Sequence, residues 1–285
     1  MKQKISVVIN TLNEENNLPY ALRSVHNWAD EIVVVDMHSE DCTVEIAKQY
    51  GAKVYFHERI AAFDGARQFA IEQASNEWIL VLDADELVPE PLSRALLDII
   101  ATDKFDIVII PRLNFLIGAP MMHTGWGPDQ DRHPRLFKKN KLTTSSTIHE
   151  FMAPMDGAII HEIKHSDGHA IIHFNYIDTN HFIAKLNRYT DVEARQAYDR
   201  NEKSSMIRAT ILATKEFVNR YLIKKGYLDG WRGFYLSIFM AFYRLATLSK
   251  LKEFNEFGGR EQIFTAYRKE AERILEEYGP LESEL

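Results

Sequence analysis

The sequence of 285 residues has a single cysteine, Cys42, so it cannot form an internal disulfide bond. Chains without disulfides are typical of a reducing compartment, and we therefore expect a cytoplasmic protein. No stretch approaches the roughly eighteen uncharged apolar residues that a membrane-spanning helix needs. The apolar run that begins at Ile5 is also too short for the core of a signal peptide.

Two glycine-rich nucleotide-binding motifs are missing as well. Gly-x-Gly-x-x-Gly does not follow the first expected strand, and Gly-x-x-x-x-Gly-Lys-Ser/Thr occurs nowhere in the chain. These absences argue against the usual dinucleotide-binding site and against P-loop hydrolysis. Excess positive charge is lacking too, because 41 acidic and 34 basic residues give a net charge of -7, which argues against a nucleic-acid-binding protein.

Short apolar runs alternate with amphipathic stretches over residues 5–110. This alternation predicts an α/β protein with a mostly parallel, Rossmann-like sheet between two layers of helices. We expect the strands at 5–9, 32–35, 53–56, 78–82 and 106–110, and the helices around 18–25, 44–50, 63–74 and 92–100.

The strand expected at 78–82 runs directly into three carboxylates, Asp83, Asp85 and Glu86. In open α/β sheets ligands bind at the carboxyl ends of the strands. Carboxylates crowded there repel one another unless a positive charge neutralises them, and Mg²⁺ takes one or two carboxylates together with substrate phosphates. The Asp-x-Asp pair therefore predicts a divalent cation, Mg²⁺ or Mn²⁺, that carries a diphosphate.

Other polar residues follow the neighbouring strands. Thr11, Asn13 and Glu14 come after the first strand and Asp36 after the second, so all should reach the same crevice. Arg67, on the helix before the strand 78–82, is placed to hold phosphates. Plainer roles stay open: Asn13 and Glu14 could cap a helix, and Arg67 could be a solvated or salt-bridged residue.

Three segments in this order resemble family 2 glycosyltransferases with the GT-A fold, and the resemblance covers residues 4–110. Residues 7–18 read Val-Val-Ile-Asn-Thr-Leu-Asn-Glu-Glu-Asn-Asn-Leu. Residues 31–43 read Glu-Ile-Val-Val-Val-Asp-Met-His-Ser-Glu-Asp-Cys-Thr, and residues 78–86 read Trp-Ile-Leu-Val-Leu-Asp-Ala-Asp-Glu.

The resemblance implies a role for each residue of the crevice. Arg67 would help to bind the donor, and Asp83 and Asp85 would bind the ribose and a metal on the diphosphate. Met37 and His38 depart from the family, which more often has small residues there. The nucleobase and ribose of a sugar nucleotide would be held by Thr11, Asn13, Glu14 and Asp36.

A sugar transfer with inversion needs a base to deprotonate the acceptor hydroxyl, and a carboxylate suffices. The candidates are Glu150, which we favour, and Asp131. The stretches around Trp126, Asp131 and Glu150 resemble family 2 enzymes of the lipopolysaccharide-core or lipid-linked-glycan type. Either acid could instead belong to a structural ion pair, for instance Asp131 with Arg132 or Arg135.

Residues 157–165 and 169–177 flank Ser-Asp-Gly at 166–168, which predicts a β-hairpin. His173 lies in the second of these segments, at a point where the resembled enzymes also have a histidine. It could complete the metal shell, or it could bond to a backbone carbonyl as an ordinary strand histidine.

From residue 181 to 285 the pattern becomes helical. Residues 234–251 are rich in aromatic side chains and basic at the C-terminal end, which suits a helix that lies in a membrane interface above anionic headgroups. A core helix or a helix of a homo-oligomer would have a similar composition. The resemblance, in which the acceptor is a lipid-linked or lipopolysaccharide glycan, favours peripheral attachment at the cytoplasmic face.

The sequence therefore predicts a metal-dependent inverting glycosyltransferase that uses a nucleotide-sugar, most plausibly UDP-linked. Residues 1–180 would form the GT-A domain, with a donor half at 1–112 and an acceptor half at 113–180, and residues 181–285 would form a helical extension. Two alternatives stay open, a sugar-1-phosphate nucleotidylyltransferase and a non-catalytic nucleotide-sugar-binding scaffold.

Overall fold

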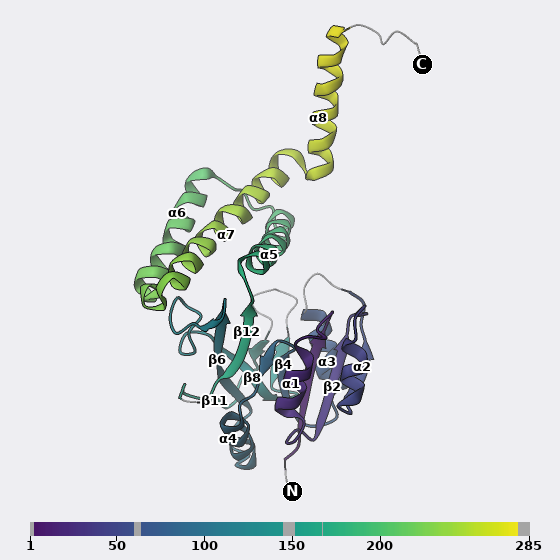
Figure 1. Cartoon of the computed structure of the whole chain (residues 1–285), viewed down its shortest axis with the longest axis vertical. Helices are drawn as coiled ribbons and strands as arrows, with labels where there is room; N and C mark the ends of the chain where they lie inside the picture. The colour runs from purple at the N-terminus through teal and green to yellow at the C-terminus, as the bar shows by residue number, and fades with distance from the viewer. Residues whose placement is uncertain (1–2, 60–63, 145–151, 167, 279–285) are drawn as a thin grey trace.

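The structure, a computed structural model, describes residues 3–59, 64–144, 152–166 and 168–278 of the chain (Figure 1). Four parallel strands in the order β3-β2-β1-β4 form one part of the sheet, as predicted. Three of them bury nearly every side chain, as parallel strands covered on both faces do. The four are β1 (Ile5–Thr11), β2 (Glu31–Asp36), β3 (Lys53–Phe56) and β4 (Trp78–Asp83).

The other part of the sheet is mixed. Strand β8 (Arg132–Lys138) lies antiparallel between β4 and β6 (Ile107–Leu116), and β12 (Ile171–Tyr176) runs parallel to β6. The two-residue strand β5 (Glu86–Leu87) pairs antiparallel with β12, so the acids after β4 meet His173. Short strands complete the set: β7 (Ala119–Pro120), β9 (Leu142–Thr144), β10 (Met152–Pro154) and β11 (Ile160–Glu162).

The predicted β-hairpin across 166–168 is wrong. Strands β11 and β12 both pair with β6, and both run parallel to it, so they cannot form a hairpin with each other. The reason is the length of β6, which extends past the end expected at 110 and reaches Leu116. Its first half pairs with β11 and its second half with β12.

Helices cover both faces of the sheet. Side chains of β1 alternate between the two layers: Val7 and Ile9 belong to the core that includes α1, α2 and α4, whereas Val8 packs with residues of α3. This alternation gives the three-layer arrangement that the sequence predicts. The helices are α1 (Leu18–Val25), α2 (Thr43–Gln49), α3 (Asp64–Gln73) and α4 (Glu90–Ala101).

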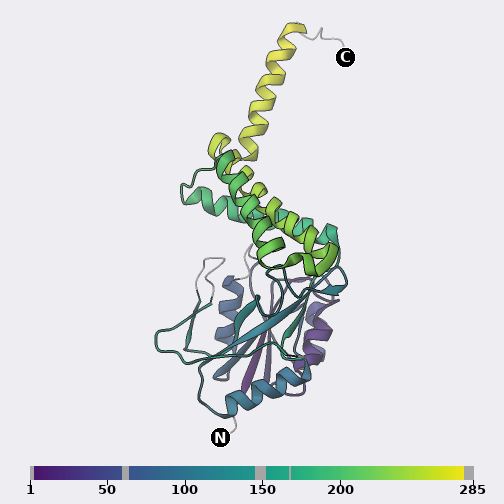
Figure 2. The ribbon, with the colours of Figure 1, turned by 90° about the vertical axis from the view of Figure 1, so that its left-hand side faces the viewer.

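The C-terminal region is helical, as predicted, and lies beyond the carboxyl ends of the strands (Figures 1 and 2). Helix α7 packs against both α5 and α6, whereas α8 projects from the rest of the molecule in both views. No helix in the described ranges is long and apolar enough to cross a membrane. The elements are α5 (Thr179–Asp199), α6 (Met206–Val218), η1 (Asn219–Ile223), η2 (Gly226–Asp229), α7 (Gly230–Phe257), α8 (Arg260–Leu275) and η3 (Glu276–Tyr278).

A buried carboxylate joins the helical region to the sheet. Asp229 accepts hydrogen bonds of 3.0 Å from the amides of Met122 and His123, and one of 2.6 Å from the Thr124 hydroxyl. On the other side of the joint, Arg232 donates to the carbonyl oxygens at the end of β6. The start of α7 is therefore fixed relative to the crevice.

We expect Asp229→Ala to lower the free energy of unfolding by roughly 2–4 kcal/mol, because hydrogen bonds to a charged group contribute about 1.5–3 kcal/mol and their donors would be left unpaired. Urea unfolding followed by tryptophan fluorescence measures this. Asp156→Ala, at an exposed turn, serves as the control. Equal unfolding free energies for the two variants would contradict the role of this joint.

Candidate functional site

The loops after β1 and β2 are locked together at the carboxyl edge of the sheet. Asp36 is fully buried, and its carboxylate accepts hydrogen bonds from the Thr11 hydroxyl (2.9 Å) and from the amide and hydroxyl of Ser39. The amide of Asn13 donates to Ser39 Oγ, and that of Glu14 donates to a hydroxyl at the start of α2. The residues predicted to hold a nucleoside thus lie in two loops that hydrogen bonds connect at the carboxyl edge of the sheet.

Glu14 faces the acids that follow β4. Burial raises the pKa of its carboxyl, the hydrogen bond from Asn17 lowers it, and the nearby charge of Asp85 raises it again. Lys185 of α5 also acts on Glu14, and its Nζ lies 4.0 Å from Asp85 Oδ2. The ends of β1 and β4 therefore face one crevice, with α5 above it.

Asp83 is held by two guanidinium groups. Arg67 Nη2 lies 2.6 Å from Asp83 Oδ1, and Arg135 Nη2 lies 3.1 Å from Oδ2. Burial alone would raise the pKa of Asp83, but the charges of the two arginines outweigh it and hold the pKa well below its ordinary value. Asp83 is therefore ionised at neutral pH.

Glu86 is bound by cationic side chains and a backbone amide. It is completely buried and accepts hydrogen bonds from Arg135 (2.8 Å), Arg112 (3.3 Å) and the amide of Asp83 (2.9 Å). The same Arg135 nitrogen thus contacts both acids. No local sequence pattern predicts these contacts, because the two arginines lie on β6 and β8, far along the chain.

Asp85 faces His173, whose Nε2 lies 3.4 Å from Asp85 Oδ2. The other ring nitrogen, Nδ1, lies 2.6 Å from Asn114 Oδ1. The Asn114 amide nitrogen donates to Asp131 Oδ2 and to the Trp126 carbonyl, so its oxygen must be the acceptor toward the ring. In the neutral ring, Nδ1 therefore carries the proton and the Nε2 lone pair faces Asp85.

A lone pair and a carboxylate that face each other fit a bound cation. Bonds from Mg²⁺ to its ligands measure about 2.1 Å, so atoms 3.4 Å apart can both contact one ion. No three His, Cys, Asp or Glu side chains within the described ranges converge into a complete metal shell. Mg²⁺ and Mn²⁺ sites that bind diphosphates need fewer protein ligands, since phosphate oxygens supply the rest.

Asp131 is connected to Asp85 through Asn114 and His173. Its carboxylate accepts hydrogen bonds from His133 Nε2 (2.7 Å), Arg112 Nε (2.9 Å) and Asn114 Nδ2 (2.6 Å). Burial would raise its pKa, but the bond from His133 and the charge of Arg112 lower it. Asp131 thus forms an ion pair, with Arg112 in place of the Arg132 or Arg135 named above. The other candidate base, Glu150, lies outside the described residues.

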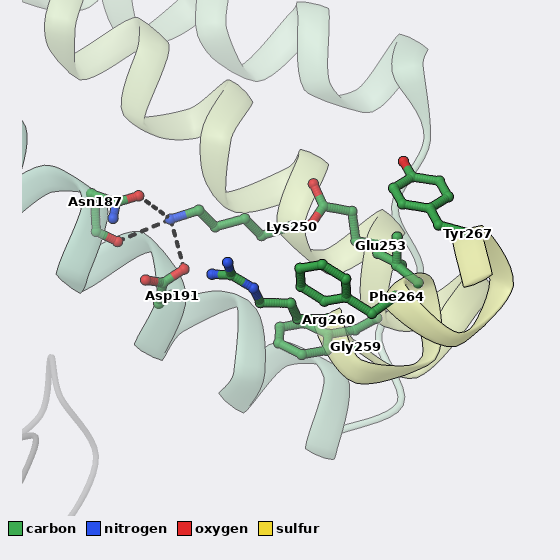
Figure 3. Close-up of a pocket in the computed structure, with 10 residues that line it drawn as sticks. Asn187, Asp191, Lys250, Glu253, Gly259, Arg260, Phe264 and Tyr267 are labelled. Atoms are coloured by element: carbon green, nitrogen blue, oxygen red, sulfur yellow. Dashed lines mark hydrogen bonds and ion pairs between the residues drawn. The ribbon is translucent and has the colours of Figure 1, made fainter. Parts of the chain in front are cut away.

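A hollow of about 400 Å³ lies at the elbow between α7 and α8, away from the sheet (Figure 3). Lys250 points into it but is already bound to the Asn187 carbonyl and side chain, to Thr190 and to Asp191. This hollow contains none of the residues predicted for the site, and its lysine ties α7 to α5.

The comparison with known proteins identifies the family. The family model described as "Glycosyl transferase family 2" matches residues 6–160 of the chain. An uncharacterized glycosyltransferase of Rickettsia bellii is 30% identical over 89% of this chain and 87% of its own. The chain therefore belongs to the family 2 glycosyltransferases, and its mixed sheet flanked by helices is a GT-A fold, as the sequence segments predict.

Two further relatives are more specifically named. The lipopolysaccharide core biosynthesis glycosyltransferase LpsC of Rhizobium meliloti is 25% identical over 92% of this chain and 97% of its own. Glucosyl-3-phosphoglycerate synthase of Mycobacterium tuberculosis, solved with Mn²⁺ and UDP, is 24% identical over 40% of this chain and 44% of its own, with a TM-score of 0.34.

We expect Arg135→Met to lower the free energy of unfolding by roughly 3–5 kcal/mol at pH 7.5, because it leaves buried carboxylates without their partner. In the wild type the depressed pKa of Asp83 stabilises the fold above the unfolded-state pKa, and this stability is lost only as the pH falls through the folded-state pKa. In the variant the acids protonate at higher pH, so the deficit should shrink toward pH 5.

Urea unfolding at the two pH values measures this deficit. Arg94→Met is the matched control, because Arg94 forms an exposed ion pair with Glu90 and such pairs contribute about 0–1 kcal/mol. A deficit for Arg135→Met that is the same at both pH values would contradict the electrostatic explanation.

Proposed function

We propose that this family 2 enzyme is a metal-dependent inverting glycosyltransferase that moves a sugar from a nucleotide-sugar, UDP-linked in our proposal, to a hydroxyl group of a glycan. The observation that carries the proposal is the facing pair of Asp85 Oδ2 and His173 Nε2, 3.4 Å apart, beside the ionised Asp83. This pair lies at the sheet edge where the loops after β1 and β2 also end.

The donor half, residues 1–112, would bind the nucleotide. Arg67 lies against Asp83 and could turn from it to the donor phosphates with little movement. The acceptor half would be residues 113–180, with the helical region 181–285 above it. Of the residues proposed for the nucleoside, Asn13 and Glu14 would contact it directly. Thr11 and Asp36, whose side chains are fully buried, would order the edge beneath it through their hydrogen bonds.

Asp85 and His173 would hold Mg²⁺ or Mn²⁺, with Asp83 close enough to contribute. When bound, the cation would neutralise the charge that develops on the diphosphate leaving group. The protein supplies the orientation: Asn114 fixes the tautomer of His173, and Asp131 fixes Asn114.

Glu150 would be the base. The acceptor oxygen attacks the anomeric carbon from the face opposite the diphosphate, the bond from that carbon to the phosphate oxygen breaks, and the hydroxyl proton passes to the carboxylate. Asp131 is a weaker candidate, because its carboxylate already accepts three hydrogen bonds and its pKa is lowered. These contacts support a positioning role for Asp131.

The acceptor in this proposal is a cell-surface or lipid-linked glycan, reached from the cytoplasmic face of an anionic membrane to which the enzyme binds peripherally. The relative LpsC and the basic, aromatic α7 support this location. A homo-oligomer would use α8, because residues 260–269 carry a net charge of +2 and residues 270–278 a net charge of -3, so antiparallel copies complement each other.

A transfer assay with UDP-sugars, Mn²⁺ and a lipid-linked glycan tests the function. We expect UDP release with the wild type, and a kcat about 10²–10⁴ lower for Glu150→Gln with UDP binding unchanged. Asp85→Ala should lose the Mn²⁺-dependent part of UDP binding. Donor binding without transfer to any acceptor would favour a scaffold, and pyrophosphate release from a nucleoside triphosphate would favour a nucleotidylyltransferase; either result would contradict the proposal.

The positioning role of Asn114 has its own test. Loss of an outer partner of a metal-bound histidine typically weakens metal affinity about 10–100-fold, and we expect Asn114→Leu to do so for Mn²⁺ in the presence of UDP. Isothermal titration measures the affinity without catalysis. The control is Asn140→Leu at an exposed turn. An unchanged affinity in Asn114→Leu would show that His173 does not need this partner.

A further inference from the structure

Helix α7 presents an exposed stripe of large apolar side chains. Their spacing of three and four residues places them along one face over four turns. Trp231, Tyr235 and Phe242 are each about half exposed, at 51%, 50% and 53%. We call this set the α7 stripe: Trp231, Phe234, Tyr235, Ile238, Phe242 and Leu245.

The opposite side of α7 is a true core face. Leu236, Leu248 and Leu251 are buried, and they belong to clusters that include residues of α5. The stripe is therefore the outer surface of a well-packed helix. It also continues onto neighbouring elements, since the Phe234 ring contacts Phe217 of α6 and Tyr221 of η1.

The segment of the chain that carries the stripe is strongly basic. Residues 203–252 contain ten Lys or Arg and only two Asp or Glu, a net charge of +8 in a chain whose total is -7. Part of this charge is paired, because Glu216 binds Arg220 and Arg244. Lys250 and Lys252 are paired with Asp191 and Glu256. An exposed apolar face in such a setting has the chemistry of a surface that binds negatively charged headgroups.

We propose that the α7 stripe docks on the surface of an anionic lipid bilayer, with its apolar side chains inserted and the surrounding cations at the headgroups. This deepens the proposed function, on which it rests, by naming the surface that meets the membrane. A second copy of the chain fits less well, because a two-fold interface would place the same +8 segment against itself. Trp and Tyr, both present in the stripe, are enriched at membrane interfaces.

The start of the stripe lies next to the end of β6. Arg232, next to the first residue of the stripe, binds the carbonyl oxygens of Leu116 and Ile117 at the end of β6. Lys185 of α5, which packs on α7, reaches Asp85. The helices that carry and support the stripe are therefore in contact with the crevice.

Flotation with phospholipid vesicles, without donor or acceptor, tests the surface. We expect the full-length protein to bind vesicles that contain phosphatidylglycerol and to bind phosphatidylcholine vesicles at least about ten-fold more weakly. Trp231→Ser with Phe242→Ser should weaken binding to the anionic vesicles about ten-fold or more. Lys224→Gln with Lys225→Gln should weaken it and reduce its dependence on salt.

The matched control is Tyr267→Ser with Leu275→Ser on α8, two residues that are more exposed than those of the stripe, at 70% and 62%. Thermal stabilisation by UDP with Mn²⁺ shows whether each variant keeps its site, so a failure of the sugar-transfer proposal is seen separately. Vesicle binding that survives the stripe variant, or an absence of binding by the wild type, would overturn the proposal. A dimer on size exclusion that the stripe variant converts to monomer would assign the surface to a second copy.

Discussion

Charge neutralisation at the end of β4 is the constraint on which the rest of the site depends. Three carboxylates within four residues cannot be buried together unless cations approach them. Arg67 from α3, Arg112 from β6 and Arg135 from β8 supply those charges, and Arg135 contacts both Asp83 and Glu86. The antiparallel insertion of β8 between β4 and β6 is what brings the last of these arginines to the acids.

The three acids have different surroundings and therefore different roles. Glu86 is fully buried between guanidinium groups and fixes the loop. Asp83 is partly exposed and shares its arginines, so it stays ionised at the crevice. Asp85 faces an imidazole in place of an arginine. A residue that faces a lone pair is free to share a cation in a way that an arginine-bound residue is not.

The sequence predicted the parallel strands β1 to β4 and the polar residues at their ends well, because these signals are local. Each buried strand is a continuous apolar run, and each polar group follows such a run directly, so Thr11, Asp36 and Asp83 could be placed at one edge before any coordinates. The contacts around β6, β8 and β12 were predicted poorly because they are not local. Arg112, Asn114 and Asp131 meet only after β6 extends past Pro111 and pairs with both β8 and β12.

The failed hairpin has the same origin. Ser-Asp-Gly between two isoleucine-rich segments is an ordinary turn signal, yet the length of the β6 edge decided the pairing. Asp131 shows the corresponding limit for chemistry. From the sequence alone, an acid in a loop is equally consistent with a catalytic base and with a partner in an ion pair. The structure shows that Asp131 accepts hydrogen bonds from three side chains, one of which is Asn114.

Positive and negative charges are separated along the chain, and this separation favours one orientation of the protein on an anionic membrane. Outside residues 203–252 the chain has 24 basic and 39 acidic residues, a net charge of -15, against +8 within that segment. An anionic surface would repel the catalytic body and attract the helical region, so the electrostatic field alone would favour one orientation over all others. That orientation is also the one in which the apolar α7 stripe meets the lipid. Electrostatic attraction to the headgroups and burial of the apolar side chains then favour the same face of the protein. A uniformly basic protein would lack the preferred orientation, and an uncharged apolar helix would lack the attraction.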